Sequence, residues 1–197
     1  MSRPPELWLV RHGETPFSRT GHYTGRRDLP LSDEGERQAR AVGARLAGRS
    51  FSAVLVSPLL RARQTCALAG YAAAAREDPD LVEWDYGAHE GRRHSDVLAE
   101  RPGWTIWRDG APGGERLADV AARAARVLAR LEGSIGDAAL FAHGHLLRVL
   151  AALWLGLPPE AARLLRLQTG SLSVLGHEEA TRVVQLWNER IWADVDR

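Results

Sequence analysis

Four side chains that can handle an anionic group stand just after short apolar runs of the chain. Arg11 and His12 directly follow the first run, Arg61 lies shortly after the second, and His143 directly follows the third. Two arginines and two histidines brought together need an anion to offset their charge. A phosphoryl dianion suits them, because arginine forks bind its oxygens and a histidine nitrogen can attack its phosphorus. These residues therefore indicate a phosphoryl-transfer site.

A parallel sheet would bring the four side chains to one place. The runs at 7–10, 53–56 and 138–142 are apolar throughout, which is typical of strands buried in a parallel sheet. Ligands of such sheets bind beyond the carboxyl ends of the strands, where the arginines and histidines would meet. We therefore predict an α/β fold, a three-layer α/β/α sandwich around a mostly parallel central sheet.

Helices are predicted between these strands. Ser32 can cap a helix whose first turn carries Asp33 and Glu34, and Gly48 ends it. The clearest amphipathic stripe lies at 117–131. Further helices are predicted from Pro58 to about Leu68, across 146–155 and from Pro158 onward, and a closing pair of strands at 173–175 and 183–187 around a turn near Glu179.

We predict a single domain over residues 1–197. The sequence contains no repeat, no low-complexity linker and no convincing domain boundary. The stretch 71–114 is the least regular part, with three tryptophans, many turn residues and little periodicity. We interpret this stretch as an irregular cap over the sheet.

The composition excludes several other functions. The 197-residue chain is 45% hydrophobic and 26% charged, as expected of a globular domain. Its net charge of +1 provides no overall attraction to nucleic acid or membranes. All 26 basic residues are arginine, which excludes chemistry that needs a lysine, such as Schiff bases and the Walker phosphate loop.

Cysteine usage and the apolar runs also bear on where the protein works. Cys66 is the single cysteine, so no internal disulfide can form, which fits a reducing compartment. The run at 7–10 is too short for the core of a signal peptide or for a membrane helix. We therefore expect a cytoplasmic protein without a membrane partner.

The residues around the four side chains carry a family resemblance. The segment 11–15, Arg-His-Gly-Glu-Thr, resembles the signature of the histidine phosphatase superfamily, the phosphoglycerate mutase-like group. Four later segments resemble further motifs in the family's order: 57–65, 83–91, 112–115 and 143–145. The loop at 18–25 is similar to that of its broad-specificity acid phosphatases and sugar-phosphate phosphatases. The resemblance covers most of the chain and implies a phosphoglycerate mutase-like fold.

The resemblance implies a role for each matching residue. His12 would attack phosphorus and form a phosphohistidine, while Arg11, Arg61 and His143 would bind the phosphoryl oxygens. Glu83 would protonate the leaving alkoxide and then accept a proton from water. No metal or other cofactor is implied. The attacking nitrogen of His12 must be unprotonated, so we expect its other nitrogen to donate to a backbone carbonyl or a carboxylate.

Three assignments stay open at this stage. Glu90 is a second acid seven residues after Glu83 and could take its role, although Glu83 stands where the family has its acid. His145 is interpreted as structural more readily than as functional. Arg26 could equally belong to a solvated turn.

Substrate contacts are predicted from the loop after the nucleophile and from two later motifs. In the family this loop contacts the phosphate and the rest of the substrate, and Ser18 stands where relatives often have asparagine. The amides of the helix that follows His143 would add to the anion site. The predicted contacts are Ser18, His22, Tyr23, Thr24, Gly25, Arg26, His89 and Gly144.

We therefore predict a phosphomonoester hydrolase whose partner is a small-molecule phosphate ester. Alternatives are a cofactor-dependent phosphoglycerate mutase and an alpha-ribazole phosphate phosphatase. A hydrolase is favoured because only six residues separate Trp107 from Gly114, where mutases of this family carry a longer basic insertion. A metal hydrolase using His143 and His145 lacks evident further ligands, and a non-catalytic phospholigand module would not need the complete set of catalytic residues. The sequence leaves the substrate and the oligomeric state open.

Overall fold

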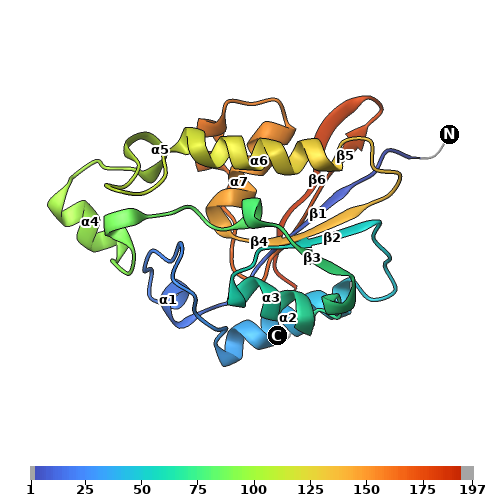
Figure 1. The fold of residues 1–197 in the computed structure, drawn as a ribbon, viewed down its shortest axis with the longest axis horizontal. Helices are drawn as coiled ribbons and strands as arrows, with labels where there is room; N and C mark the ends of the chain where they lie inside the picture. The colour runs from blue at the N-terminus through green and yellow to red at the C-terminus, as the bar shows by residue number, and fades with distance from the viewer. Residues whose placement is uncertain (1–2, 192–197) are drawn as a thin grey trace.

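The structure, a computed structural model, describes residues 3–191, which contain one six-stranded sheet with helices on both faces (Figure 1). Its strands are β1 Leu7–Arg11, β2 Ala53–Val56, β3 Ala75–Glu77, β4 Ala138–Ala142, β5 Leu172–Glu178 and β6 Thr181–Glu189. Their order in the sheet is β3-β2-β4-β1-β5-β6. The first four of these in space pair in parallel, whereas β5 and β6 are antiparallel to their neighbours. The predicted α/β sandwich with a mostly parallel sheet is confirmed.

Helices connect the strands. The α-helices are α1 Pro16–Arg19, α2 Asp33–Arg45, α3 Leu60–Leu68, α4 His94–Glu100, α5 Ile106–Asp109, α6 Leu117–Leu131 and α7 Gly144–Trp154. Short 3-10 helices are η1 Ala72–Ala74, η2 Pro79–Leu81, η3 Gly87–His89 and η4 Pro159–Leu164. In Figure 1, α6 and α7 lie above the sheet, and α2 and α3 lie below it.

Alternation along β1 shows how both faces of the sheet are covered. Successive side chains of a strand point to opposite faces. Leu7 and Leu9 pack into one core with α6 and α7, while Trp8 and Val10 pack into a second core with α2 and α3. Every residue of β4 is buried as well. The continuous apolar runs therefore reflect a sheet that is covered on both faces.

The strand predictions are confirmed, and so is the helix cap at Ser32, whose hydroxyl accepts from the Gly35 amide at 3.1 Å. The predicted start at Pro58 is wrong, because α3 begins at Leu60. The Leu60 amide is instead capped by the Asp28 carboxylate at 2.6 Å, a partner distant in sequence.

Other local predictions differ from the structure for physical reasons. The segment after Pro158 forms the 3-10 helix η4 rather than an α-helix, and Arg148 donates to two of its last carbonyls, those of Ala162 and Arg163. Strand β3 was not predicted because it has three residues and no apolar run. Residues 75–77, within the proposed cap at 71–114, thus belong to the sheet, and the cap itself stays a prediction.

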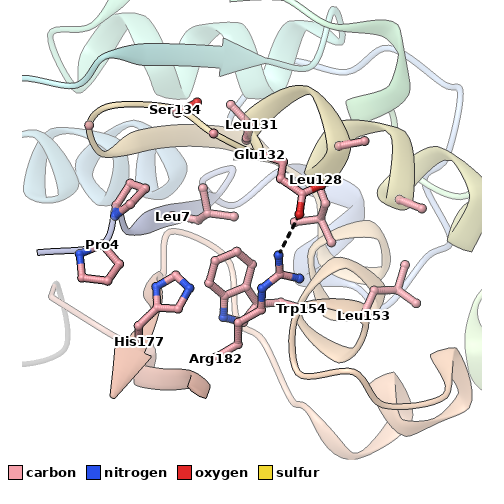
Figure 2. Close-up of a pocket in the computed structure, with 15 residues that line it drawn as sticks. Pro4, Leu7, Leu128, Leu131, Glu132, Ser134, Leu153, Trp154, His177 and Arg182 are labelled. Carbon is pink, nitrogen blue, oxygen red and sulfur yellow. Dashed lines mark ion pairs between the residues drawn. The ribbon is translucent and has the colours of Figure 1, made fainter. Parts of the chain in front are cut away.

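A cavity of about 440 Å³ lies at the amino end of β1 and beside the loop that precedes β4 (Figure 2). Its walls are mostly apolar, with Leu7, Leu128 and Trp154 among the residues drawn. The Arg182 guanidinium lies over the Trp154 ring and pairs with Glu132 at 3.5 Å. None of the predicted site residues lines this cavity. Within residues 3–191, every helix is too short or too polar to span a membrane.

Candidate active site

A smaller cavity, of about 200 Å³, lies at the opposite end of the sheet, where β1 and β4 end. The predicted residues that line it are Arg11, His12, Ser18, His22, Tyr23, Thr24, Glu83 and Gly144. Residues that line it without having been predicted as contacts are Thr15, Gly21, Tyr86, His145, Arg148 and Leu167. The cavity is therefore where an open parallel sheet binds ligands, and we define it as the site pocket.

His12 is held in a single protonation form. Its side chain is buried, and Nδ1 lies 2.7 Å from the Gly13 carbonyl oxygen. Because a carbonyl only accepts, Nδ1 carries the proton and Nε2 is unprotonated. Burial, assisted by the charges of Arg61 and Arg11, holds the pKa of His12 well below its ordinary value. The expected hydrogen bond to a backbone carbonyl is thus confirmed, and Nε2 is available as a nucleophile.

The ring of His143 lies next to that of His12, with 5.1 Å between the two ring centroids. Nε of Arg61 donates to Nδ1 of His143 at 3.2 Å, so Nε2 of His143 carries the proton and donates to the Ser57 hydroxyl at 2.7 Å. Burial and the Arg61 charge hold the pKa of His143 well below its ordinary value. His143 is therefore a neutral ring with both nitrogens engaged.

Arg61 is fully buried and ties the substrate loop to α3. Its remaining donors bind the carbonyl oxygens of Thr24, Gly25 and Arg27 at 2.9–3.1 Å. Neither Arg61 nor His143 lines the site pocket. The predicted contacts of these two residues with phosphoryl oxygens stay predictions. Together with burial, the charge of Arg61 lowers the pKa of His12.

Arg11 has unused donor capacity in the pocket. Nη1 donates to the Leu167 carbonyl at 2.5 Å, whereas Nε is buried and has no hydrogen-bond partner among residues 3–191. Burial lowers the pKa of Arg11, and the charge of Glu83 opposes that effect. A Cβ on Gly144 would lie 3.1 Å from the Arg11 guanidinium carbon, so glycine lets the two meet closely. An unpaired guanidinium beside a helix start favours an anion.

Glu83 is buried and accepts hydrogen bonds from three backbone amides. Oε1 accepts from Trp84 at 2.9 Å and from Leu146 at 3.1 Å, and Oε2 accepts from His145 at 3.1 Å. Burial by itself raises the pKa of Glu83, but the nearby His145 and these amides outweigh it and lower the pKa. The two amides from the first turn of α7 fix this carboxylate at the helix start, beside the pocket.

The ring of His145 lies between Glu83 and Tyr86. The Tyr86 hydroxyl is 2.5 Å from Nδ1, which lies 4.0 Å from the Glu83 carboxylate. Burial lowers the pKa of His145 to about 4 and raises that of Tyr86 well above its ordinary value. At neutral pH the imidazole is therefore uncharged, and it shares one hydrogen bond with the tyrosine hydroxyl.

Arg148 is a further cation in the pocket wall. Nε and Nη2 donate to the carbonyls of Ala162 and Arg163, both at 3.0 Å, and the guanidinium carbon lies 4.5 Å from the centre of the Trp107 ring. Burial and the charge of Arg11 lower the pKa of Arg148 to about 10, so it remains charged at neutral pH. No carboxylate pairs with it within residues 3–191.

The predicted substrate loop lies partly in the pocket. Ser18 lines it, but its hydroxyl also binds the amide and carbonyl of Thr15 and so closes the cap of α1. The ring of His22 accepts or donates one hydrogen bond with the Thr20 hydroxyl at 2.7 Å. Tyr23 hydrogen-bonds the exposed His94 through its hydroxyl at 2.7 Å.

Three predicted contacts do not line the pocket. Arg26 is exposed and faces Asp85 at 3.6 Å, and His89 is buried with both ring nitrogens unpartnered among residues 3–191. The Gly25 amide donates to Glu90 at 2.7 Å. Their contacts with substrate stay predictions.

The alternative acid, Glu90, also lies outside the pocket lining. Its Oε1 accepts from the amides of Gly25, Arg26 and Tyr86 at 2.7–3.4 Å. These contacts join the substrate loop to the third motif. The geometry therefore favours Glu83 over Glu90 as the acid, because only Glu83 faces the pocket.

Sequence reasoning did not predict Arg148 or His145 as pocket residues, although both line the pocket. Arg148 is the only charged residue of α7, and it lies one helical turn after Gly144. A lone charge on an apolar helix was the signal that could have identified it, because such residues are seldom buried without a partner. The ring of His145 is hydrogen-bonded to the hydroxyl of Tyr86, which is 59 positions away in the sequence. No local sequence pattern therefore connects the two residues.

The pocket combines a nucleophilic imidazole, a buried carboxylate and unpaired guanidinium groups. Among residues 3–191, no cluster of three or more His, Cys, Asp or Glu side chains is arranged to hold a metal ion. A sandwich of this topology with an uncharged, buried histidine just after β1 fits the class of α/β enzymes that transfer phosphoryl groups. Residues 7–190 match the histidine phosphatase superfamily (branch 1), and the chain belongs to this family.

Relatives agree with this assignment. The chain is 36% identical to sedoheptulose 1,7-bisphosphatase of Saccharomyces cerevisiae, over 79% of this chain and 69% of that protein. It is 35% identical to an acid phosphatase of Mycobacterium tuberculosis, over 91% and 90% of the two chains. It is 33% identical to a probable phosphoglycerate mutase of Salmonella choleraesuis, over 96% and 93%. A solved structure from Mycobacterium tuberculosis superimposes with a TM-score of 0.89 at 33% identity, covering 96% of this chain and all of that one.

Proposed function

We propose that this chain is a phosphomonoester hydrolase that acts on small phosphorylated metabolites through a phosphohistidine at His12. The observation that carries this proposal is one pocket that holds three groups together. They are His12 with an unprotonated Nε2, the Glu83 carboxylate, and Arg11 with an unpartnered Nε. The names of the yeast bisphosphatase and the mycobacterial acid phosphatase support phosphatase chemistry.

The first half-reaction forms the phosphoenzyme. Nε2 of His12 attacks the phosphorus of the ester, and the bond to the leaving oxygen breaks. Glu83, as a carboxylic acid, donates its proton to that oxygen, and an alcohol departs. The free donors of Arg11 stabilise the charge on the remaining phosphoryl oxygens.

The second half-reaction returns the enzyme to its starting form. Glu83, now a carboxylate, accepts a proton from water while the water oxygen attacks the phosphorus. The phosphorus–nitrogen bond breaks, inorganic phosphate is released, and Nε2 of His12 is free again. Nδ1 keeps its proton throughout because the Gly13 carbonyl holds it.

Glu83 must gain a proton before it can act as an acid. Its pKa is lowered in the structure by the amides that bind it and by nearby positive charge. A phosphate dianion beside Arg11 would offset that positive charge and place a like charge near the carboxylate, and both effects raise the pKa of Glu83. The substrate therefore prepares its own acid catalyst.

A phosphoglycerate mutase is the second candidate, favoured by the likeness to the Salmonella protein that bears that name. A mutase must keep water out and return the phosphoryl group to a bound phosphoglycerate. Only the last two residues of α5 and the segment 110–116 lie between Trp107 and α6, which leaves little chain to enclose the pocket. An alpha-ribazole phosphate phosphatase stays within the main proposal as one substrate choice.

Phosphate release from a panel of small phosphate esters tests the function. We expect release to continue after exhaustive chelation, because the pocket's positive charge comes from arginine. Loss of activity on chelation and its return with zinc or magnesium would contradict the proposal. With 3-phosphoglycerate and a bisphosphoglycerate primer, phosphate should form faster than 2-phosphoglycerate, and the reverse would make the chain a mutase. That it lies in the cytoplasm and binds no nucleic acid stays a prediction.

A further inference from the structure

Arg148 lines the site pocket, but it lies on helix α7 and not at the end of β1, where Arg11 and His12 lie. Arg11 lies at the end of β1 and packs against Gly144, the first residue of α7. Arg148 is four residues further along that helix, which is about 6 Å at the usual rise per residue. The two guanidinium groups thus belong to neighbouring parts of one pocket.

The hydrogen bonds of Arg148 leave one edge of its guanidinium free. Nε and Nη2 are bound to the carbonyls of Ala162 and Arg163, and the group is stacked on Trp107. Nη1 has no hydrogen-bond partner among residues 3–191, and an arginine carries five N–H donors in all. The side chain is therefore fixed in place with an unused edge, which is the arrangement that binds an oxyanion.

No carboxylate among residues 3–191 forms an ion pair with Arg148, although the charge of Glu83 acts on it and opposes the lowering of its pKa by burial. Glu83, the acidic residue of the pocket, is occupied by three amides. Exposed arginines of this chain are often paired, as Arg126 is with Asp80 at 2.6 Å. A partly buried cation without such a partner needs a counter-charge from a ligand.

We propose that Arg148 binds a second anionic group of the substrate, a carboxylate or a second phosphate on the leaving-group side of the scissile ester. This inference rests on the proposed phosphatase function and specifies its substrate class. The enzyme then selects small esters that carry two anionic groups. Arg148 is a specificity residue, because it contacts the part of the substrate that departs.

Two matched substrates test the proposal. 3-Phosphoglycerate and glycerol 3-phosphate differ in having a carboxylate or a hydroxymethyl group at the far carbon. Phosphate release should give a higher kcat/KM for 3-phosphoglycerate with the natural enzyme. In Arg148→Met this preference should fall by about 10- to 100-fold, as expected when a charged hydrogen bond is lost. Arg148→Lys keeps the charge without the fork and should retain part of the preference.

A control and a second substrate pair complete the design. Arg163→Ala removes an equal charge from an exposed side chain nearby and should leave the preference unchanged. Fructose 1,6-bisphosphate compared with fructose 6-phosphate shows whether a second phosphate also raises kcat/KM. Because each result is a ratio on one enzyme preparation, partial unfolding of a variant cancels.

The outcomes distinguish a failure of the inference about Arg148 from a failure of the proposed function. Equal losses for both members of each pair would place Arg148 at the transferred phosphoryl group and overturn the inference. The same holds if the natural enzyme releases phosphate without any preference for two anionic groups. Failure to release phosphate from every ester would instead contradict the proposed function.

Discussion

The imidazole of His12 is prepared for attack by neighbours of two kinds, a carbonyl and two arginines. The Gly13 carbonyl holds the proton on Nδ1, and the cationic Arg61 and Arg11 disfavour a second proton. The first contact selects the tautomer, and burial together with the charges keeps the ring neutral. A histidine after a strand is ordinary by itself, and these surroundings make it a candidate nucleophile.

The role of Glu83 can be tested through the leaving group. An alkoxide needs a proton to depart, whereas p-nitrophenolate leaves readily without one. Glu83→Gln should therefore lower phosphate release from an alkyl phosphate by about 100- to 10,000-fold, the usual range for general acid catalysis. Formation of the phosphoenzyme from p-nitrophenyl phosphate should fall far less.

The measurement compares burst-phase rates for the two esters. Glu90→Gln provides a second carboxylate-to-amide change, at a residue that lies outside the pocket. If Glu83→Gln slowed both esters equally, or if Glu90→Gln produced the leaving-group dependence, Glu83 would not be the acid.

At the scale of elements, helix α6 holds the segment that carries Glu83. Arg123 on α6 binds both carboxylate oxygens of Glu115, at 2.7 and 2.9 Å, and donates to the carbonyls of Asp80 and Val82. Glu115 in turn accepts from the Asp85 amide at 2.9 Å. One buried arginine thus joins the residues on both sides of Glu83 to a helix of the core.

Removal of this arginine should destabilise the protein strongly. Arg123→Met leaves the largely buried Glu115 with only the exposed Arg26, at 3.8 Å, as a cationic partner. Breaking one partner of a buried pair costs about 3–5 kcal/mol. Urea unfolding at neutral pH measures the loss. Arg126→Ala, on the exposed face of α6, should have little effect. Equal, small losses for the two variants would contradict this account of α6.

Elements that are marked by a local pattern of apolar residues could be predicted from the sequence. Elements whose ends or form depend on distant partners could not. The apolar runs identified the core strands because burial on both faces leaves a local pattern. The start of α3 depends on the Asp28 carboxylate, and the form of η4 on Arg148. Neither dependence leaves a pattern in the segment itself.

The same distinction holds for the site. Residues at strand ends, such as His12, were predicted because topology brings them together. Arg148 was not, since its place in the pocket follows from how α7 packs against Trp107. Ser18 was predicted as a substrate contact. The hydrogen bonds between its hydroxyl and Thr15 depend on the short helix α1, which was not predicted.

At the scale of the whole molecule, the buried histidines should make folding depend on pH. The pKa of His145 is about 4 in the folded protein, against an ordinary value of 6.5. As the pH falls below 6.5 the unfolded chain binds a proton that the folded chain refuses, so stability decreases until the pH approaches 4. His145 contributes up to about 3 kcal/mol to this decrease.

Urea unfolding at pH 7 and at pH 4.5 measures the effect. His145→Gln can still accept from the Tyr86 hydroxyl but cannot be protonated, so it should lose less stability between the two values than the natural protein. An identical loss in both proteins would show that His145 does not account for the acid sensitivity.

The central claim is that His12 carries the phosphoryl group. The enzyme is mixed with a phosphate ester and quenched in alkali, because phosphohistidine survives in alkali. It is then digested with a protease that cleaves after arginine. Cleavage after Arg11 and Arg19 yields a peptide whose one histidine is His12. We predict a phosphoryl group on this peptide, stable in alkali and lost in acid, and absent from His12→Ala. Rapid phosphate release without any such labelled peptide, or with the label on another residue, would contradict the account.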